Sequence, residues 1–233
     1  MKQIPRLFPW LLLVTSLALT VGAAIHLVAE LWVNPARHLI QHIGSPATAN
    51  ARKIDEESWS HAISSLQSAR FLVPGNAEYH MWNAWLHQRR AEGFPPWSDA
   101  AKTALRVAET SYGDALRQRP SWGLLWINRA QVRVRLGSSP DLAMADLQRA
   151  VHFDPRNPHV VKQAIRLGFV LWHGMDPEER RGFLYLIRNN VHRMPYDIID
   201  LARRHGLLDT LRPLYATDPK LKELWERKLG AEQ

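Results

Sequence analysis

The chain has 233 residues, with 30 Lys and Arg against 22 Asp and Glu, and a formal net charge of +8. It contains no Cys, which excludes a thiol nucleophile, a cysteine zinc site and any disulfide. The length allows one sizeable domain beside an anchor. The positive charge favours acidic partners such as anionic lipid headgroups, acidic glycans or nucleic acid. Segments that alternate with period two are scarce, so we expect an all-α protein.

The N-terminal segment 7–33 is strongly apolar. About 20 apolar residues, at ~1.5 Å rise each, span a hydrocarbon core of about 30 Å. Trp10 and Trp32 lie near the two ends of the segment, where aromatic belts form. Lys2 and Arg6 precede it, so the positive-inside rule places the N-terminus in the cytoplasm and the rest of the chain across the membrane.

A cleaved signal peptide is the alternative interpretation, with small residues at 21–24 as the cleavage site. The apolar run continues past these residues, which favours a retained anchor. His26 and Glu30 have i,i+4 spacing near its outer end, and we expect them in the outer headgroup layer. Residues 34–43 are expected to continue the helix or to form a short amphipathic segment.

Three segments share the spacing A-x3-large-x2-A-x4-P. They are Ala62, Leu66, Ala69 and Pro74; Ala108, Tyr112, Ala115 and Pro120; and Ala143, Leu147, Ala150 and Pro155. The first three positions fall on one helix face, and the proline ends the helix. The prolines lie 46 and 35 residues apart, and the second interval is close to the ~34-residue tetratricopeptide period. We expect stacked helical hairpins, with an irregular helical domain as the alternative.

The domain organisation follows from these patterns. We predict a transmembrane anchor at 1–33, a juxtamembrane segment and linker at 34–54, and a tetratricopeptide-like helical-hairpin solenoid at 55–233. Asp55 is a good N-cap for the first domain helix, with acidic residues after it. Beyond residue 194 the spacing breaks down, as expected of terminal units that cap a stacked array.

The sequence contains no nucleophile-elbow motif and no glycine-rich phosphate loop. Asp141 and Asp146 are carboxylates of one predicted helix, and we expect them away from the face that carries the repeat alanines. His38 and His42 have i,i+4 spacing but lack a third ligand. We therefore predict no enzyme activity, no cofactor and no metal site.

The tryptophans offer a candidate binding groove, because several share helical spacing with arginines. The candidate residues are Trp82, Trp85, Trp122, Trp126, Arg129 and Arg133. On a concave surface, the indoles would stack on sugar faces and the arginines would meet acidic groups. The alternative is that the tryptophans belong to the core, as at the signature Trp of the repeat.

Two long segments, RPSWGLLWINRAQVRVRLG at 119–137 and LQRAVHFDPRNPHVVKQAIRLGFVLW at 147–172, carry a family resemblance. A single N-terminal span precedes them, and a Pro195…Ala202…Gly206 segment follows. Together they resemble the polysaccharide-biosynthesis accessory proteins of the VpsP type, over roughly residues 9–213. The resemblance rests on packing motifs. It implies a membrane-anchored periplasmic helper in polymer assembly and provides no catalytic residues.

The expected function is a non-catalytic scaffold in bacterial exopolysaccharide biosynthesis or export, anchored in the inner membrane with its domain in the periplasm. Expected partners are the proteins of a polysaccharide synthesis or export complex, the membrane, and an acidic polysaccharide. A periplasmic position argues against nucleic acid. The alternatives are a polysaccharide-binding module that uses the Trp/Arg groove and, with least support, an enzyme acting on glycan.

Overall fold

The computed structural model describes residues 8–44 and 54–230, and within these ranges it contains helices and no strand. The prediction of an all-α protein is confirmed. The α-helices are α1 (Phe8–Gly44), α2 (Glu56–Leu72), α3 (Ala77–Arg90), α4 (Asp99–Gln118), α5 (Gly123–Leu136), α6 (Pro140–Phe153), α7 (Pro158–Leu171), α8 (Pro177–Asn190), α9 (Pro195–Arg204), α10 (Leu208–Ala216) and α11 (Pro219–Gly230). Lys2, Arg6 and most of the expected linker lie outside the described residues. The chain divides into two compact units, Met1–Pro120 and Ser121–Gln233.

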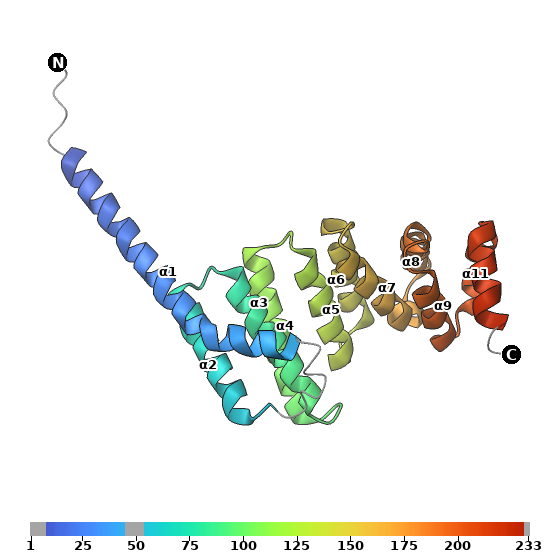
Figure 1. Ribbon diagram of the computed structural model, residues 1–233, viewed down its shortest axis with the longest axis horizontal. Coiled ribbons are helices and arrows are strands. Elements are labelled where there is room, and N and C mark those ends of the chain that lie inside the picture. The colour runs from blue at the N-terminus through green and yellow to red at the C-terminus, as the bar shows by residue number, and fades with distance from the viewer. Residues whose placement is uncertain (1–7, 45–53, 231–233) are drawn as a thin grey trace, which may run out of the picture. The chain divides into compact units, whose positions relative to one another are not determined.

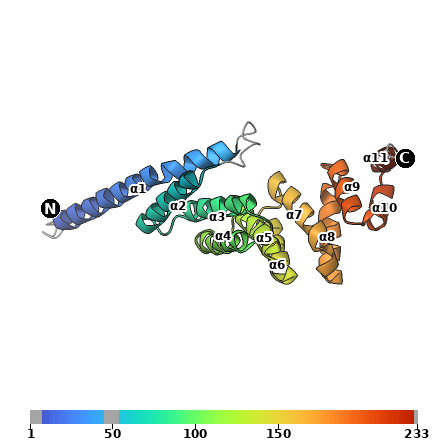
Figure 2. The same cartoon turned by 90° about the horizontal axis from the view of Figure 1, so that it is seen from below.

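Helix α1 has two halves with different surroundings. Its first half projects away from the rest of its unit in both views (Figures 1 and 2), and apolar side chains from Trp10 onward are exposed. In its second half, Ala29, Val33, Ala36 and Leu39 are buried in one core with α2 and α3. The helix passes through Pro35 without interruption. Among the described residues, α1 is the one helix long and apolar enough to cross a membrane.

The expected helix starts are present. Asp55 caps α2, where its carboxylate accepts a hydrogen bond of 2.7 Å from the N–H of Ser58, and Ser98 caps α4 through the N–H of Ala101. Helix α8 begins with a capping box, in which Asp176 and Glu179 each bind the other's backbone N–H. These side chains satisfy donors that a helix N-terminus otherwise leaves unpaired.

The three repeated segments have equivalent environments. All nine of their alanine, leucine and tyrosine side chains are buried, as predicted: Ala62, Leu66, Ala69, Ala108, Tyr112, Ala115, Ala143, Leu147 and Ala150. Before each proline, a backbone N–H donates to the carbonyl of the second alanine: Val73 to Ala69 (2.9 Å), Arg119 to Ala115 (2.9 Å) and Asp154 to Ala150 (3.0 Å). Small side chains therefore let a neighbouring helix approach, and each helix ends in the same way. A tetratricopeptide-like arrangement of the hairpins remains a prediction.

Helices pack mainly against their neighbours in the chain. The pairs α1 with α2, α3 with α4, and α5 with α6 make extensive contacts, and α7 joins the second unit through α6. At the C-terminal end the helices are shorter, as the loss of the repeat spacing predicts. There Tyr215 donates a hydrogen bond of 2.7 Å to the carbonyl oxygen of Pro195 and packs against Trp225.

Candidate functional site

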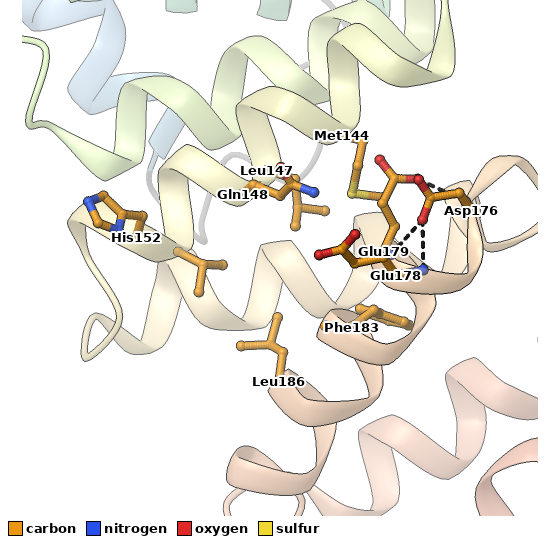
Figure 3. Close-up of a pocket in the computed structure, with 11 residues that line it drawn as sticks. Met144, Leu147, Gln148, His152, Asp176, Glu178, Glu179, Phe183 and Leu186 are labelled. Atoms are coloured by element: carbon orange, nitrogen blue, oxygen red, sulfur yellow. Dashed lines mark hydrogen bonds between the residues drawn. The ribbon is translucent and has the colours of Figure 1, made fainter.

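The second unit carries an open pocket of about 630 Å³ between α6 and α8 (Figure 3). Its floor is apolar and its rim is polar and acidic. The apolar lining residues are Met144, Leu147, Val151, Phe183 and Leu186, and the polar ones include Gln148, His152, Asp176, Glu178 and Glu179. The helical period brings Met144, Leu147 and Val151 to one face of α6, opposite Phe183 and Leu186 of α8. We call this feature the α6–α8 pocket.

The acidic end of the pocket is built by the start of α8. Asp176 Oδ1 accepts hydrogen bonds of 2.8 Å from the N–H groups of Glu178 and Glu179. Glu179 Oε2 in turn accepts a hydrogen bond of 2.9 Å from the N–H of Asp176. These bonds fix two of the three carboxylates at the rim and leave their negative charge in place. Glu178 is exposed beside them.

The floor is held by close packing between α7 and α8. Phe183 lies edge-on to Phe169, with ring centroids 5.4 Å apart. Gly168 of α7 faces the Phe183 ring so closely that an added Cβ would come within 2.1 Å of Phe183 Cε2. The absence of a side chain at 168 is therefore what allows the Phe183 ring to occupy this position beneath the pocket.

The pocket suits a ligand that is both apolar and positively charged. Met144, Leu147 and Phe183 offer apolar surface, while the three carboxylates complement a cation. His152, at the end of the pocket opposite Asp176 (Figure 3), packs edge-on against Phe153 with centroids 5.1 Å apart. Sequence inspection missed this site because its residues come from two helices and each looks like a core or capping residue on its own.

In the second unit, the structure brings together Trp126 and Arg129 of the predicted groove. The Arg129 guanidinium carbon lies 4.7 Å from the centroid of the Trp126 ring, and that of Arg149 lies 4.8 Å away. Phe153 stacks beside the same indole at 6.5 Å. Trp126 is thus half-buried among protein groups, and Trp122 is half-buried at the N-cap of α5.

Both groove arginines of this unit are bound to one buried carboxylate. Arg129 makes a two-pronged contact with Asp146, from Nε at 2.8 Å and from Nη2 at 2.7 Å, and Arg133 Nη1 donates to Asp146 at 2.9 Å. The side chain of Asp146 has no exposed surface. The expectation that Asp146 lies away from the alanine face is wrong, because Asp146 comes three positions after Ala143 and i,i+3 positions share a helix face. Asp141 is exposed.

In the first unit, Trp82 and Trp85 of α3 are also half-buried. Arg37 of α1 lies over the Trp82 ring, with its guanidinium carbon 5.4 Å from the centroid, and Arg89 lies over Trp85 at 5.2 Å. The two indoles therefore stack on arginines from α1 and α3. Because they are half-buried, they are not wholly core residues, and because an arginine lies over each ring, they are not open surfaces for sugar stacking.

The histidines of α3 serve the packing of the first unit. Nε2 of His80 lies 2.8 Å from the carbonyl oxygen of Pro74. Burial, with the nearby charges of Arg90 and Arg70, lowers the pKa of His87 to about 4, so this imidazole is neutral at physiological pH. Within the described part of the chain, no three His, Asp or Glu side chains are grouped so as to hold a metal ion.

We compared the chain with protein-family models and with curated proteins, and nothing in either set matches it.

Proposed function

We propose that this protein is a non-catalytic, membrane-anchored adaptor that holds a partner protein through the α6–α8 pocket. The observation that carries the proposal is the pairing of an apolar floor with an acidic rim in a chain whose net charge is +8. A segment with an apolar side chain next to a Lys or Arg would bury the first against Phe183 and place the second beside Glu178. The anchor would be α1, the one described helix able to cross a membrane.

A peptide segment fits this pocket better than a reacting substrate does. The pocket is open along two helices, and peptides that bind helical grooves present side chains at such spacings. Its carboxylates at 176 and 179 are occupied with capping the helix, which restricts their movement. General acid–base chemistry needs a carboxylate or imidazole held beside the reacting group, whereas the floor of this pocket consists of Met144, Leu147 and Phe183, which offer apolar packing surface.

The pathway and location belong to the same proposal. The resemblance of segments 119–137 and 147–172 to VpsP-type accessory proteins supports a role in exopolysaccharide synthesis or export. The order of a basic N-terminus followed by an apolar span supports an inner-membrane anchor with the domain in the periplasm. An adaptor tethered in this way raises the local concentration of its partner at the membrane.

The alternative, a polysaccharide-binding groove, has weaker support. Sugars stack on open indole faces, but Arg129, Arg149 and Phe153 already surround Trp126. Arg129 and Arg133 also neutralise Asp146, so an acidic glycan would have to compete with a buried carboxylate. Binding of acidic polymer to the intact protein, lost on Trp126→Ala and kept on Leu186→Ala, would favour this alternative.

The test is site-specific photo-crosslinking of the full-length protein in its native cells. A benzoylphenylalanine replaces Gln148 or Gly182 in the pocket, where a Cβ at 182 meets nothing within 4 Å. The matched control replaces Tyr185, which is 67% exposed on α8 outside the pocket. We expect one discrete protein adduct from both pocket positions and none from position 185. Mass spectrometry of the adduct should identify a component of polysaccharide synthesis or export.

A charge variant sharpens this experiment. Glu178→Lys reverses one rim charge without touching the capping box and should reduce the adduct several-fold. Lys220→Glu, an exposed reversal on α11, should leave it unchanged. Equal labelling from positions 148, 182 and 185, or an adduct that ignores Glu178→Lys, would contradict the pocket. A pocket adduct with a protein of another pathway would contradict the role in polysaccharide synthesis alone.

A further inference from the structure

The end of α2, where the chain turns toward α3, carries one largely exposed aromatic side chain, while the next two residues, Leu72 and Val73, are half-buried against the core shared with α1 and α3. We call residues 71–75, with the sequence FLVPG, the α2–α3 corner. Phe71 is 86% exposed, more than any other large apolar side chain among the described residues, the outward face of the α1 span included. Single exposed apolar residues are common, but a connection normally carries polar residues.

The other repeats provide an internal comparison. The three residues before each repeat proline occupy equivalent places, since each helix ends with the same hydrogen bond. These residues are Phe71, Leu72 and Val73; Arg117, Gln118 and Arg119; and His152, Phe153 and Asp154. The first set is wholly apolar and the other two contain charged or polar groups. Leu72 and Val73 pack against the core of the first unit, but Phe71 is exposed, so the fold of the repeat does not require an apolar residue at position 71.

What distinguishes the first corner is its position beside α1. Ala69, two residues before Phe71, lies in the same buried cluster as Ala29. Tyr79, just after the corner, donates a hydrogen bond of 2.7 Å to Glu30. The corner thus lies at the level of α1 where burial against the domain begins. The exposed stretch that precedes this level, residues 10–28, is about 28 Å long at ~1.5 Å per residue, which matches a hydrocarbon core of about 30 Å.

We propose that the α2–α3 corner contacts the bilayer that α1 crosses, with Phe71 inserted among the lipid headgroups. This inference rests on the anchor role of α1 in the proposed function. Aromatic side chains favour this zone because it accommodates an apolar ring close to water. The corner and α1 together would hold the first unit against the membrane at two points and so limit its rotation about the anchor.

The absence of native Cys makes the test direct. Single cysteines replace Phe71, Ser60 or Leu19 in the full-length protein, each is labelled with a nitroxide, and each variant is reconstituted in phospholipid nanodiscs. Ser60 is exposed and three turns before Phe71 on the same face of α2, about 17 Å away. Leu19 is 74% exposed in the α1 span. For each label, the relaxation of the nitroxide by oxygen, which concentrates in lipid, is compared with its relaxation by a water-soluble nickel chelate.

We expect relaxation by oxygen to dominate at position 19 and relaxation by the nickel chelate to dominate at position 60. At position 71 we expect the ratio of oxygen to nickel relaxation to be several-fold above that at position 60. A lipid signal at 19 with equal ratios at 71 and 60 would overturn the corner contact and leave the anchor intact. Lipid signals at both 71 and 60 would overturn the localised contact, since the whole of α2 would then lie in the bilayer. A water signal at 19 would overturn the anchor itself, and the corner contact with it.

Discussion

Glu30, just beyond the exposed stretch of α1, accepts a hydrogen bond of 2.7 Å from the phenol of Tyr79 and forms an ion pair of 2.8 Å with Arg37. Burial, together with the bond to Glu30, raises the pKa of Tyr79 to about 12, so the phenol keeps its proton and acts as the donor. This contact joins α3 to α1 just beyond the exposed stretch.

Removing this donor should loosen the first unit. Tyr79→Phe leaves the ring in the core but deletes the hydrogen bond to the Glu30 carboxylate. Bonds to charged groups contribute about 1.5–3 kcal/mol. Because the Glu30 side chain is 47% exposed, we expect a loss nearer 1 kcal/mol and a midpoint about 2–4 °C lower in thermal unfolding followed by circular dichroism in detergent. Tyr185→Phe, at an exposed position, is the control and should shift nothing. Equal unfolding midpoints for the two variants would contradict a stabilising role for the hydrogen bond between Tyr79 and Glu30.

The buried carboxylate of the second unit should be far more sensitive. Asp146→Asn keeps the size of the side chain but leaves Arg129 and Arg133 without their counter-charge in a buried setting. Breaking a buried pair by removing one partner costs about 3–5 kcal/mol. We expect the free energy of unfolding, measured in urea, to fall by about 3 kcal/mol, against less than about 0.5 kcal/mol for the exposed Asp141→Asn.

A small effect at Asp146 would mean that water or rearranged arginines replace the carboxylate. The variant has a second use, since it removes the counter-charge that Asp146 gives to Arg129 and Arg133. A gain of affinity for an acidic polymer in the folded fraction of Asp146→Asn would show that pairing with Asp146 competes with polymer binding in the parent protein.

The sequence predicted the fold where local geometry decides it. The spacing of Ala62, Leu66 and Ala69 gave the buried face of α2, and the N-cap Asp55 gave its start. The pocket could not be predicted in the same way, because Met144 and Phe183 meet only through the packing of separate helices. Asp146 was misplaced because a charged residue suggests a solvent-facing position, whereas its arginine partners lie on another helix.

The candidate groove shows the same limit. Helical spacing placed Trp126 and Arg129 beside one another, and this is confirmed by their stacking. Spacing within one helix does not reveal that the guanidinium is also bound by α6. Whether a Trp–Arg pair is a binding surface or a packing contact depends on a third residue, and here that residue comes from the neighbouring helix.

Stability should depend on pH through His87. Its pKa is about 4 in the folded protein, against 6.5 for an ordinary histidine, because burial disfavours the charged ring. Above pH 6.5 both folded and unfolded forms are neutral, and the stability is fully present. As the pH falls from 6.5 to 4, the unfolded form binds the proton first, so stability decreases through this window. His87→Gln should reduce this slope in urea unfolding measured at several pH values, and the exposed His61→Gln should not. Parallel slopes for all three proteins would contradict the assignment.

Two glycines provide an opposed pair of substitutions around the pocket. Gly168→Ala would place a methyl group 2.1 Å from Phe183 Cε2, so the ring must move, and overpacking of this kind costs about 1–3 kcal/mol. Gly182→Ala meets nothing within 4 Å and should stabilise α8 by up to about 1 kcal/mol through helix propensity. The urea midpoint of unfolding should therefore fall for Gly168→Ala and rise for Gly182→Ala, although both variants add the same methyl group. If the Phe183 ring forms the floor of the binding pocket, Gly168→Ala should also reduce the photo-adduct from position 148 in the fraction that remains folded. An unchanged adduct with lowered stability would show that the partner does not contact the floor of the pocket.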